Sequence, residues 1–458
     1  MIGARVAQLV RAAVCGTEGR QFESALVYQK MVNEKKIKPS KETPSGFEDR
    51  QEKELLIRDF VISNIKEVMI KYGFQYLETP SFEYTDSIGK YLPDKDRPGE
   101  GVFSFKDENK WLSLRYDLTA PLARYVAKNF NEISKPFKRY QLGTVWRNEK
   151  PGPGRYREFL QFDADFVGTK NLMADAELCA MIKEILIKCG LAEKDFTIKF
   201  SSRKILEGLL DRYEIKTKER RLKVLRSLDK VDRLGWKEVK KLLSSGRKDE
   251  SGDFTEGADL TKDMIDDLQS QLKYDDDGTF AYDEWDKKVN ESAYNDVKKL
   301  KENFDFYGLK NIKFDPTIIR GLEYYTGPIF EVNLNFEVKN IKGENINFGS
   351  IGGGGRYDNL VSNFGNFDYP STGISIGIDR LVYALTQKKD FNLKPSRPVV
   401  ICIFDQKNIK NYFDILNKLR LSNISSEIYP GEGKLKKQME YANKIKSPCV
   451  IFYGDDEI

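Results

Sequence analysis

Apolar side chains recur along the chain at spacings typical of helices and strands. In residues 51–72 they fall at helical intervals and a glycine follows, which predicts an amphipathic helix. These positions are Leu55, Leu56, Phe60, Ile65, Met69 and Ile70, with Gly73 after them. Short apolar and aromatic stretches predict strands, and one longer stretch predicts a helix ending at Gly190; the strands are at 75–79, 101–105, 137–145, 159–167 and 196–201, and the helix at 172–189. Strands in groups, separated by hairpins and long helices, favour an α+β fold with a largely antiparallel sheet.

The pattern changes in residues 205–308, where Lys, Arg and Asp become more frequent. The segments LKVLRSLDKVDRLG and WKEVKKLL predict amphipathic helices, so we interpret this part as a helical insertion into the sheet domain. Its basic helix faces fit contact with nucleic acid as well as they fit simple exposure to solvent. Sheet-type patterning resumes at Ile312 and runs to a helix at residues 380–385.

A smaller α/β pattern follows a linker at residues 388–398. Strands and helices alternate in it, and they are predicted at residues 399–404, 409–421, 426–429, 434–444 and 450–453. The chain stops at Ile458, directly after the last of these strands, without the helix that a doubly wound layer needs. We therefore expect this domain to be incomplete.

Residues 1–30 do not look like the rest of the chain. Their arginines and short apolar stretch are compatible with a mitochondrial presequence. However, the stretch from Val6 to Ala12 and the tripeptide Phe22-Glu23-Ser24 match what the D-arm and the T-arm of a tRNA gene encode when translated. We interpret residues 1–30 as a translated tRNA gene and expect the natural start at Met31, which the nucleotide sequence would test.

Composition narrows the classes of function. A chain of 458 residues suffices for two or three domains, and it has no apolar run long enough for a membrane-spanning helix. A net charge of +5, from 76 basic and 71 acidic residues, is too small to indicate nucleic-acid binding. The five cysteines show no metal-binding spacing and suit a reducing cytoplasm. The chain has no histidine, which excludes Ser-His-Asp, Cys-His and histidine-ligated metal chemistry.

The most unusual segment is TVWRNEKPGPGRYREFLQFDAD, residues 144–165, in which charges of both signs surround a Pro-Gly-Pro-Gly turn. Two antiparallel strands would bring these side chains together. The planar guanidinium group of arginine binds phosphates through paired hydrogen bonds, an aromatic ring stacks on a base, and a carboxylate accepts a hydrogen bond from an exocyclic amine. We therefore expect a nucleotide site rather than a salt-bridged exposed hairpin. The basic set is Arg147, Lys150, Arg155 and Arg157, with Arg139 in reach, and the acids are Glu149, Glu158, Asp163 and Asp165.

Three later segments add candidate residues. In IIRGLEYYTGPIFE, residues 318–331, Arg320 lies beside a glycine in an otherwise apolar strand, which fits poorly with a simple edge strand. FGSIGGGGRYDNLVSNFG, residues 348–365, contains four consecutive glycines that let backbone and ligand approach closely, although it lacks the dinucleotide and P-loop spacings. STGISIGIDRLVYAL, residues 371–385, predicts a strand that runs into a helix, with Arg380 near the junction.

The pieces TVWRNE…GRYREF, RGLEYYTGPIFE, GGGGRYDNLV and GISIGIDRL resemble class II aminoacyl-tRNA synthetases, and more narrowly histidyl-tRNA synthetases of the alphaproteobacterial branch. The first piece resembles the second class motif, the last resembles the third, and residues 51–80 resemble the first, dimer-forming motif. The resemblance implies an antiparallel α+β catalytic core in two parts, residues 31–204 and 309–390, around the insertion at 205–308. It also implies a C-terminal α/β anticodon-binding domain at residues 397–458.

By motif position, the resemblance assigns residues to ATP and histidine. Arg147 and Arg320 would act on the α-phosphate, and Arg320 also belongs to the histidine pocket. The ATP set is Arg147, Glu149, Arg155, Arg157, Phe159 and Arg380. Glu83, Thr85 and Gln161 would bind the amino group of histidine, and the imidazole would be read by Asp165 and Tyr325, with Tyr324 and Tyr357 nearby. This agrees with elementary chemistry, because an imidazole needs one partner at each ring nitrogen.

The activity implied is that of a cytoplasmic homodimer that joins L-histidine to tRNA-His, using ATP with Mg²⁺. Histidine would attack the α-phosphorus, and the adenylate would then transfer its histidyl group to the tRNA. No metal ligand from His or Cys is expected, and the Mg²⁺ ligands stay unassigned. Because of the expected incomplete C-terminal domain, we predict histidine activation with weak tRNA charging. The alternatives are a non-catalytic paralogue that regulates ATP phosphoribosyltransferase and an RNA-binding sensor.

Overall fold

The computed structural model describes residues 40–89, 101–248, 252–272, 291–318, 324–340, 342–346, 348–365, 368–388 and 390–454. The chain divides into two compact units, Met1–Asp49 and Arg50–Ile458. The described part of the first unit, residues 40–49, contains a turn and no helix or strand. The interpretation of residues 1–30 as a translated tRNA gene lies outside the described residues and stays a prediction.

An eight-stranded sheet forms the centre of the second unit, in the order β1-β5-β6-β15-β14-β11-β7-β10. Only the two outer pairs, β1 with β5 and β10 with β7, are parallel, and the inner pairs are antiparallel. The predicted α+β class with a largely antiparallel sheet is therefore confirmed. The strands are β1 (Gln75–Tyr76), β5 (Phe137–Trp146), β6 (Glu158–Val167), β7 (Phe196–Ser202), β10 (Ile312–Phe314), β11 (Pro328–Leu334), β14 (Ser350–Arg356) and β15 (Ser371–Gly377).

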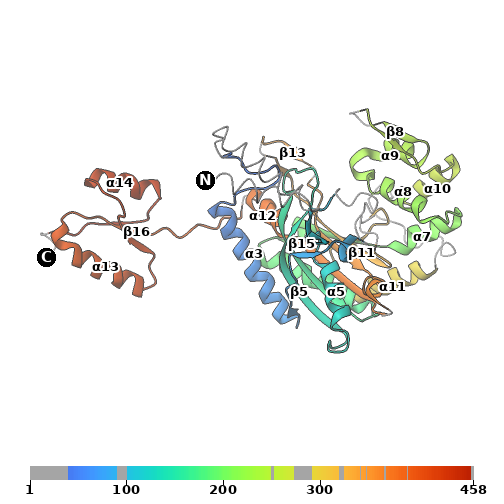
Figure 1. Ribbon diagram of the computed structural model, residues 1–458, viewed down its shortest axis with the longest axis horizontal. Coiled ribbons are helices and arrows are strands. Elements are labelled where there is room, and N and C mark those ends of the chain that lie inside the picture. Colours follow the sequence, from blue (N-terminus) through green and yellow to red (C-terminus); the bar gives the residue numbers. More distant parts are fainter. Residues whose placement is uncertain are drawn as a thin grey trace, which may run out of the picture. The chain divides into compact units, whose positions relative to one another are not determined.

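The two faces of this sheet differ because side chains alternate along each strand. On β6, Phe162, Ala164 and Phe166 belong to the main hydrophobic core. Residues from four helices pack in the same core: α3 (Glu52–Lys71), α6 (Met173–Lys188), α11 (Glu291–Phe306) and α12 (Ile378–Gln387). Figure 1 shows α3 running beside the strands of this sheet. The intervening residues of β6, among them Asp163 and Asp165, therefore face away from these helices, and this opposite face carries the polar groups.

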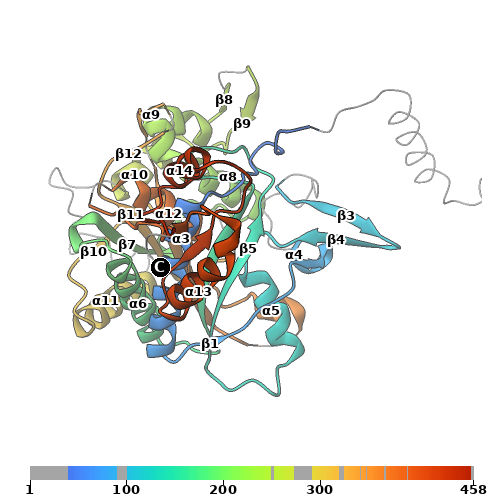
Figure 2. The ribbon, with the colours of Figure 1, turned by 90° about the vertical axis from the view of Figure 1, so that its left-hand side faces the viewer.

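A smaller sheet of order β2-β4-β3 precedes the hairpin of β5 and β6 in the chain. Its strands are β2 (Phe82–Tyr84), β3 (Ser104–Asp107) and β4 (Lys110–Leu114), and it adjoins α4 (Thr85–Gly89) and α5 (Thr119–Lys128). Figure 2 shows β3 and β4 as a hairpin that extends away from the central sheet. Of this region, the sequence predicted only a strand at 101–105, which the structure places at Ser104–Asp107.

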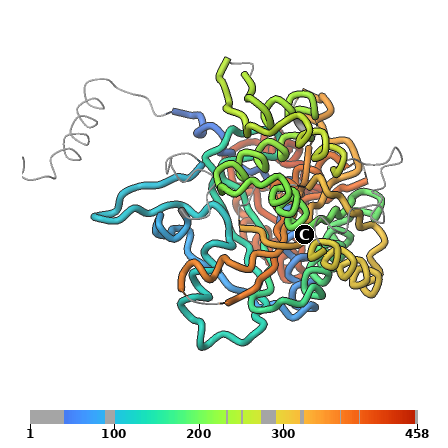
Figure 3. Tube along the Cα trace, turned by 90° about the vertical axis from the view of Figure 1, so that its right-hand side faces the viewer, coloured from blue at the N-terminus to red at the C-terminus, as the bar shows by residue number. Residues whose placement is uncertain are grey.

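The inserted region has its own hydrophobic core, which includes Leu209, Val224, Val239 and Leu268. Helices were predicted here, and they are present (Figure 3). The loop GRKDESGDFTEGADL contains the two short strands β8 and β9, which pair in an antiparallel hairpin that the sequence did not predict. The elements are α7 (Arg203–Arg212), α8 (Lys218–Leu228), α9 (Val231–Leu243), β8 (Gly246–Lys248), β9 (Phe254–Glu256) and α10 (Lys262–Gln271).

The C-terminal part also has a separate core, formed around Tyr412, Ile401 and Leu416. Its three parallel strands have the order β17-β16-β18, and the elements follow the predicted alternation. They are β16 (Val399–Ile401), α13 (Ile409–Leu421), β17 (Ser426–Ile428), α14 (Leu435–Lys444) and β18 (Val450–Ile451). The remaining elements are the pair β12 (Val338–Lys339) and β13 (Asn345–Ile346), with 3₁₀ turns at Glu193–Asp195, Val361–Phe364 and Gln406–Asn408.

Candidate active site

A cavity of about 420 Å³ lies on the polar face of the central sheet. It is lined from β6, β14 and β15, from the loop between β5 and β6, and from the segment before α5. Lys150 of the basic set lines it, together with eight of the residues assigned to ATP or histidine, namely Arg147, Glu149, Arg155, Phe159, Gln161, Tyr324, Tyr325 and Arg380. Segments far apart in the chain therefore meet at one site, as the predicted combination of nucleotide and amino acid requires.

The charged segment 144–165 forms the predicted hairpin, with Trp146 opposite Glu158 and Val145 opposite Phe159. The strands end before most of the charged residues, so Arg147 and Arg155 do not alternate on ladder positions as the sequence suggested. A backbone bond from Arg147 N to Arg157 O (2.9 Å) continues the pairing for one residue, and paired bonds between Gly152 and Arg155 close the turn. The four basic residues and Glu149 thus lie on a loop beyond the sheet, whereas Glu158, Asp163 and Asp165 lie on β6.

Arg147 lines the cavity beside two aromatic rings. Its guanidinium lies 4.6 Å from the ring centroid of Tyr116 and 5.1 Å from that of Phe159, both within cation–π range. Its Nη2 donates to Gln161 Oε1 at 3.4 Å. Arg147 therefore joins the aromatic part of the cavity to a residue predicted to bind histidine.

The other predicted ATP residues surround Arg147. Tyr116 donates its hydroxyl hydrogen bond to Glu149, and Arg157 Nε donates to Glu149 O at 3.1 Å. Arg157 itself is not among the residues that line the cavity. Arg380, in the first turn of α12, donates to Phe348 O, and its guanidinium lies 4.4 Å from the Phe348 ring centroid. Both arginines are therefore held from the side by backbone oxygens.

Asp165 is buried beneath the cavity and is engaged by two residues. Its Oδ2 lies 3.0 Å from Arg139 Nη2, and the Tyr357 hydroxyl donates to its Oδ1. Among the described residues none donates a hydrogen bond to Oδ2, so the contact with Arg139 is purely electrostatic. Burial raises the pKa of Asp165, while the Arg139 charge lowers it. Arg139 was predicted to lie in reach of the polyphosphate set, but the structure places it in the interior because the register of β5 puts it opposite Asp165.

Three tyrosines form one aromatic group at this end of the cavity. The ring centroid of Tyr324 lies 5.1 Å from that of Tyr325 and 5.8 Å from that of Tyr357. Tyr324 and Tyr325 line the cavity, whereas Tyr357 and Asp165 lie behind that lining. Burial raises the pKa of Tyr324 and of Tyr357 well above the ordinary value, so both stay neutral hydrogen-bonding groups. The predicted catalytic residue Arg320 lies outside the described residues.

Glu83 and Thr85, which were also predicted to bind histidine, are not among the residues that line the cavity. Glu83 is buried and accepts two hydrogen bonds from Arg124, at 2.6 and 2.9 Å. Thr85 shares a hydrogen bond of 2.8 Å with Ser113 in the small sheet. Both side chains are therefore engaged within the small sheet and α5.

Asp117 and Thr119 line the cavity instead, and the sequence reasoning missed them. Asp117 Oδ1 accepts from the backbone N–H groups of Thr119 (3.2 Å) and Ala120 (2.9 Å), which begin α5. Burial raises the pKa of Asp117, and these backbone bonds and the Arg147 charge oppose that rise. The available signal was an Asp two residues before the segment TAPLARYVAK, which forms α5, because an Asp at such a place is typical of a residue that caps a helix.

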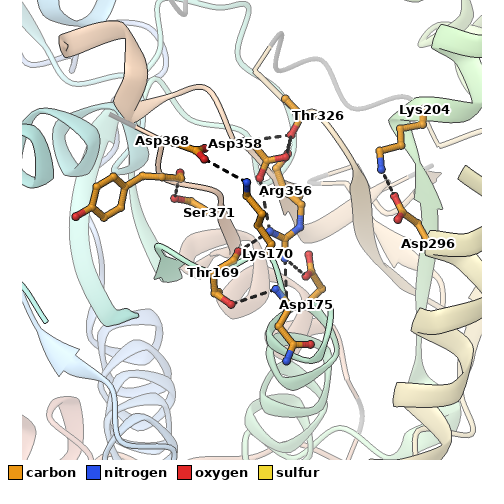
Figure 4. Close-up of polar contacts among 12 residues, drawn as sticks. Thr169, Lys170, Asp175, Lys204, Asp296, Thr326, Arg356, Asp358, Asp368 and Ser371 are labelled. Carbon is orange, nitrogen blue, oxygen red and sulfur yellow. Dashed lines mark hydrogen bonds and ion pairs between the residues drawn. The ribbon is translucent and has the colours of Figure 1, made fainter. Parts of the chain in front are cut away.

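Behind the tyrosines, Arg356 connects three segments (Figure 4). Its guanidinium donates to Thr169 O at 2.7 Å and to the carboxylate of Asp175, and both charged side chains are buried. Thr326 donates through its N–H to Arg356 O at 2.8 Å and through its hydroxyl to Asp358 Oδ2 at 2.8 Å. Thr326 directly follows Tyr325, and Arg356 directly precedes Tyr357. This cluster therefore fixes the backbone next to two tyrosines that are predicted to bind the substrate histidine.

In the part of the chain that the structure describes, no group of three or more Cys, Asp or Glu side chains is arranged to hold a metal ion. No helix in the same residues is long and apolar enough to cross a lipid bilayer.

Comparisons with known proteins agree with this architecture. The family model described as histidyl-tRNA synthetase matches residues 46–381. The chain belongs to the histidyl-tRNA synthetase family. It is 46% identical over 449 residues to the histidine–tRNA ligase of Rhodopseudomonas palustris, covering 93% of this chain and 88% of that protein. It is 45% identical over 441 residues to the histidine–tRNA ligase of Bartonella henselae, covering 93% of this chain and 89% of that protein.

The fold comparison gives the same family. The crystal structure of histidyl-tRNA synthetase from Nostoc sp. PCC 7120 superposes with a TM-score of 0.70 at 26% identity, covering 92% of this chain and 93% of that one. The predicted class II α+β core is thereby confirmed, and the alphaproteobacterial character of the sequence is confirmed by the curated relatives.

Proposed function

We propose that the chain is a histidine–tRNA ligase, which activates L-histidine with ATP and transfers the histidyl group to tRNA-His. Family membership over residues 46–381 supports this proposal, as do relatives of that name at about 45% identity over most of the chain. The observation that carries it is a buried carboxylate, Asp165, whose Oδ2 lacks a hydrogen-bond donor among the described residues and lies beside a cluster of tyrosines.

This environment suits an imidazole. Asp165 would accept from the N–H of one ring nitrogen, and the Tyr325 hydroxyl would contact the other. Tyr357 holds Asp165 through its own hydroxyl, so the carboxylate is oriented before the substrate arrives. Arg139 favours its charged form, because an opposite charge at 3.0 Å offsets part of the cost of burial.

The amino group of histidine needs acceptors, because an ammonium has three donors and no lone pair. Asp117 and the Gln161 amide oxygen are two of the acceptors that line the cavity. We assign Asp117 to this role rather than Glu83, whose carboxylate is taken up by Arg124. Thr119 supports Asp117 from the same segment.

The ATP would lie along the other half of the cavity. Phe159 offers a ring for the adenine, Glu149 an acceptor for its exocyclic amine, and Arg155, Arg157 and Arg380 the positive charge for the outer phosphates. Arg147 would contact the α-phosphate, with Arg320 as the second arginine at that position. The nucleotide would enter as its Mg²⁺ complex, which neutralises part of the phosphate charge.

The reaction would be an in-line attack of the histidine carboxylate on the α-phosphorus, with release of pyrophosphate. Positioning and charge stabilisation account for catalysis of this kind, so a site without histidine side chains suffices. The adenylate would then pass its histidyl group to the terminal ribose of tRNA-His. We further propose that the protein works as a homodimer in the cytoplasm, with helix α3 in the dimer-forming motif.

The test is ATP–pyrophosphate exchange by the purified protein, measured against each standard amino acid in turn. Exchange should depend on histidine alone. Exchange with a different amino acid would contradict the specificity, and histidine binding without any exchange would instead favour a non-catalytic paralogue that regulates ATP phosphoribosyltransferase. An RNA-binding sensor would show neither activity nor dependence on histidine. Charging of tRNA-His transcript measures the second step separately.

A further inference from the structure

Asp163 connects two side chains of the cavity wall without lining the cavity itself. Its Oδ1 accepts from Gln161 Nε2 at 2.7 Å, and its Oδ2 accepts from the Thr119 hydroxyl at 3.3 Å. The side chain is almost fully buried, and it lies two residues from Gln161 on the same face of β6. One carboxylate therefore holds a residue of the central sheet and a residue at the start of α5.

The Gln161 amide is polarised by its two neighbours. Its nitrogen donates to Asp163, and its oxygen accepts from Arg147 Nη2 at 3.4 Å. An ionised carboxylate only accepts hydrogen bonds and a guanidinium only donates them. In the reversed orientation, the amide oxygen would face the carboxylate of Asp163 and the amide nitrogen would face the guanidinium of Arg147, so neither hydrogen bond could form. The hydrogen bond to Asp163 thus keeps the amide oxygen of Gln161 on the cavity side, next to Arg147.

We propose that Asp163 is a positioning residue for amino-acid binding, which turns the Gln161 amide so that its oxygen meets the ammonium group of histidine. The inference rests on the proposed function, since it concerns the substrate of that same site. An amide nitrogen in this place would repel the ammonium, because both groups donate. The side chain that touches the substrate is Gln161, and Asp163 acts through it.

Asp163→Asn is the main test, because asparagine keeps the size and can accept from or donate to either end of the Gln161 amide. In pyrophosphate exchange we expect the KM for histidine to rise by about ten-fold or more, the typical loss when a hydrogen bond to a charged group is removed. The KM for ATP should stay near the wild-type value, since no ATP contact is assigned to Asp163. Calorimetric titration of histidine checks that the change lies in binding.

Two further variants separate positioning from a structural role. In the double variant Gln161→Ala with Asp163→Asn, the second substitution should add little to the first, because the amide through which Asp163 acts is gone. Asp195→Asn is the matched control, since Asp195 is also buried and pairs with Lys388 at 2.7 Å but does not line the cavity. It should leave the histidine KM unchanged.

The dependence on pH gives a readout that loss of stability would not produce. Burial and the nearby Asp165 raise the pKa of Asp163 to about 7, while Arg139 lowers it and Asp117 raises it further. A protonated Asp163 can donate to the Gln161 oxygen, so the ratio of the histidine KM of Asp163→Asn to that of the wild type should shrink below this pH. Titration of free histidine cancels in that ratio.

The outcomes are distinct. Equal histidine KM values in active wild type and Asp163→Asn would overturn the role of Asp163 and leave the proposed function standing. Additive effects in the double variant would overturn it as well, as would a lower thermal midpoint with unchanged kinetics. Wild-type protein without histidine-dependent exchange would overturn the proposed function and this inference together. A selective, non-additive, pH-dependent rise in the histidine KM supports the inference.

Discussion

Arg139 and Asp165 lie directly opposite each other on β5 and β6, with 3.0 Å between Nη2 and Oδ2 and almost no solvent at either side chain. The pair brings opposite charges together in the interior of the molecule, where an isolated carboxylate would take up a proton. In the proposed binding mode, recognition of histidine by Asp165 therefore depends on an arginine that is not among the residues lining the cavity.

Replacing Arg139 with Met should destabilise the protein and weaken histidine binding together. Removing one partner of a buried ion pair costs about 3–5 kcal/mol, because the remaining charge is left uncompensated. Denaturant unfolding measures the loss of stability, and pyrophosphate exchange measures the histidine KM. Lys71→Met, which breaks the exposed pair with Glu184, is the control and should cost about 0–1 kcal/mol. Similar costs for both variants would contradict this account.

Gly373 is expected to be essential because Asp165 occupies the place of its absent side chain. The two residues pair across β15 and β6, and a β-carbon on Gly373 would lie 2.0 Å from Asp165 Oδ1. The carboxylate has little room to move, since Arg139 and Tyr357 hold it. Gly373→Ala should therefore raise the histidine KM strongly while changing the ATP KM little. Gly152→Ala, where a β-carbon meets open space, should alter neither constant.

Arg147→Lys should lower the rate of adenylate formation more than it lowers affinity. Lysine keeps the positive charge but loses the planar fork and the stacking on Tyr116 and Phe159. Loss of a donor that stabilises charge in the transition state costs about 10²–10³ in kcat. Single-turnover formation of adenylate would measure this step directly. A variant with wild-type kcat and a raised ATP KM would show that Arg147 contributes only to ground-state binding.

The sequence predicted those parts of the site that depend on strand alternation and on local motifs. The alternation of apolar residues on β6 with Gln161, Asp163 and Asp165 is visible in the sequence, and so are the arginines near the turn and the junction of β15 with α12. These residues converge because neighbouring antiparallel strands align their faces.

Sequence patterns say least where long-range packing decides. Glu83 was expected at the substrate, and its contact with Arg124, which follows it by 41 residues, could not be anticipated from the sequence. Asp117 was missed because only the packing of α5 against the sheet brings that segment to the cavity. Arg139 was expected in reach of the basic residues of the hairpin, and only the register of β5 with β6 shows that it lies opposite Asp165. Neither pairing nor register can be read from spacing along one chain.

Stability of the wild type should decline from mildly acidic to neutral pH, and Asp163→Asn should reduce this decline. Burial raises the pKa of Asp163 from its ordinary value of 3.8 to about 7. Between these values the folded protein keeps a proton that the unfolded chain has lost, so the free energy of unfolding falls as pH rises. The substituted asparagine cannot ionise. The stability of the variant relative to that of the wild type should therefore increase with pH across this window and stay constant above it. Chemical denaturation at several pH values measures the difference, and a constant difference would contradict the raised pKa.

The buried pair of Arg356 and Asp175 should behave differently when one or both partners are removed. Arg356→Met leaves Asp175 charged or newly protonated in the interior and should cost about 3–5 kcal/mol of unfolding free energy. The double variant Arg356→Met with Asp175→Leu should recover much of that loss, because no buried charge remains. Histidine binding should not recover, since the guanidinium that donates to Thr169 O from the residue next to Tyr357 is gone. Unfolding and histidine titration of all three proteins measure both effects, and parallel recovery of stability and affinity would show that the cluster supports only the fold.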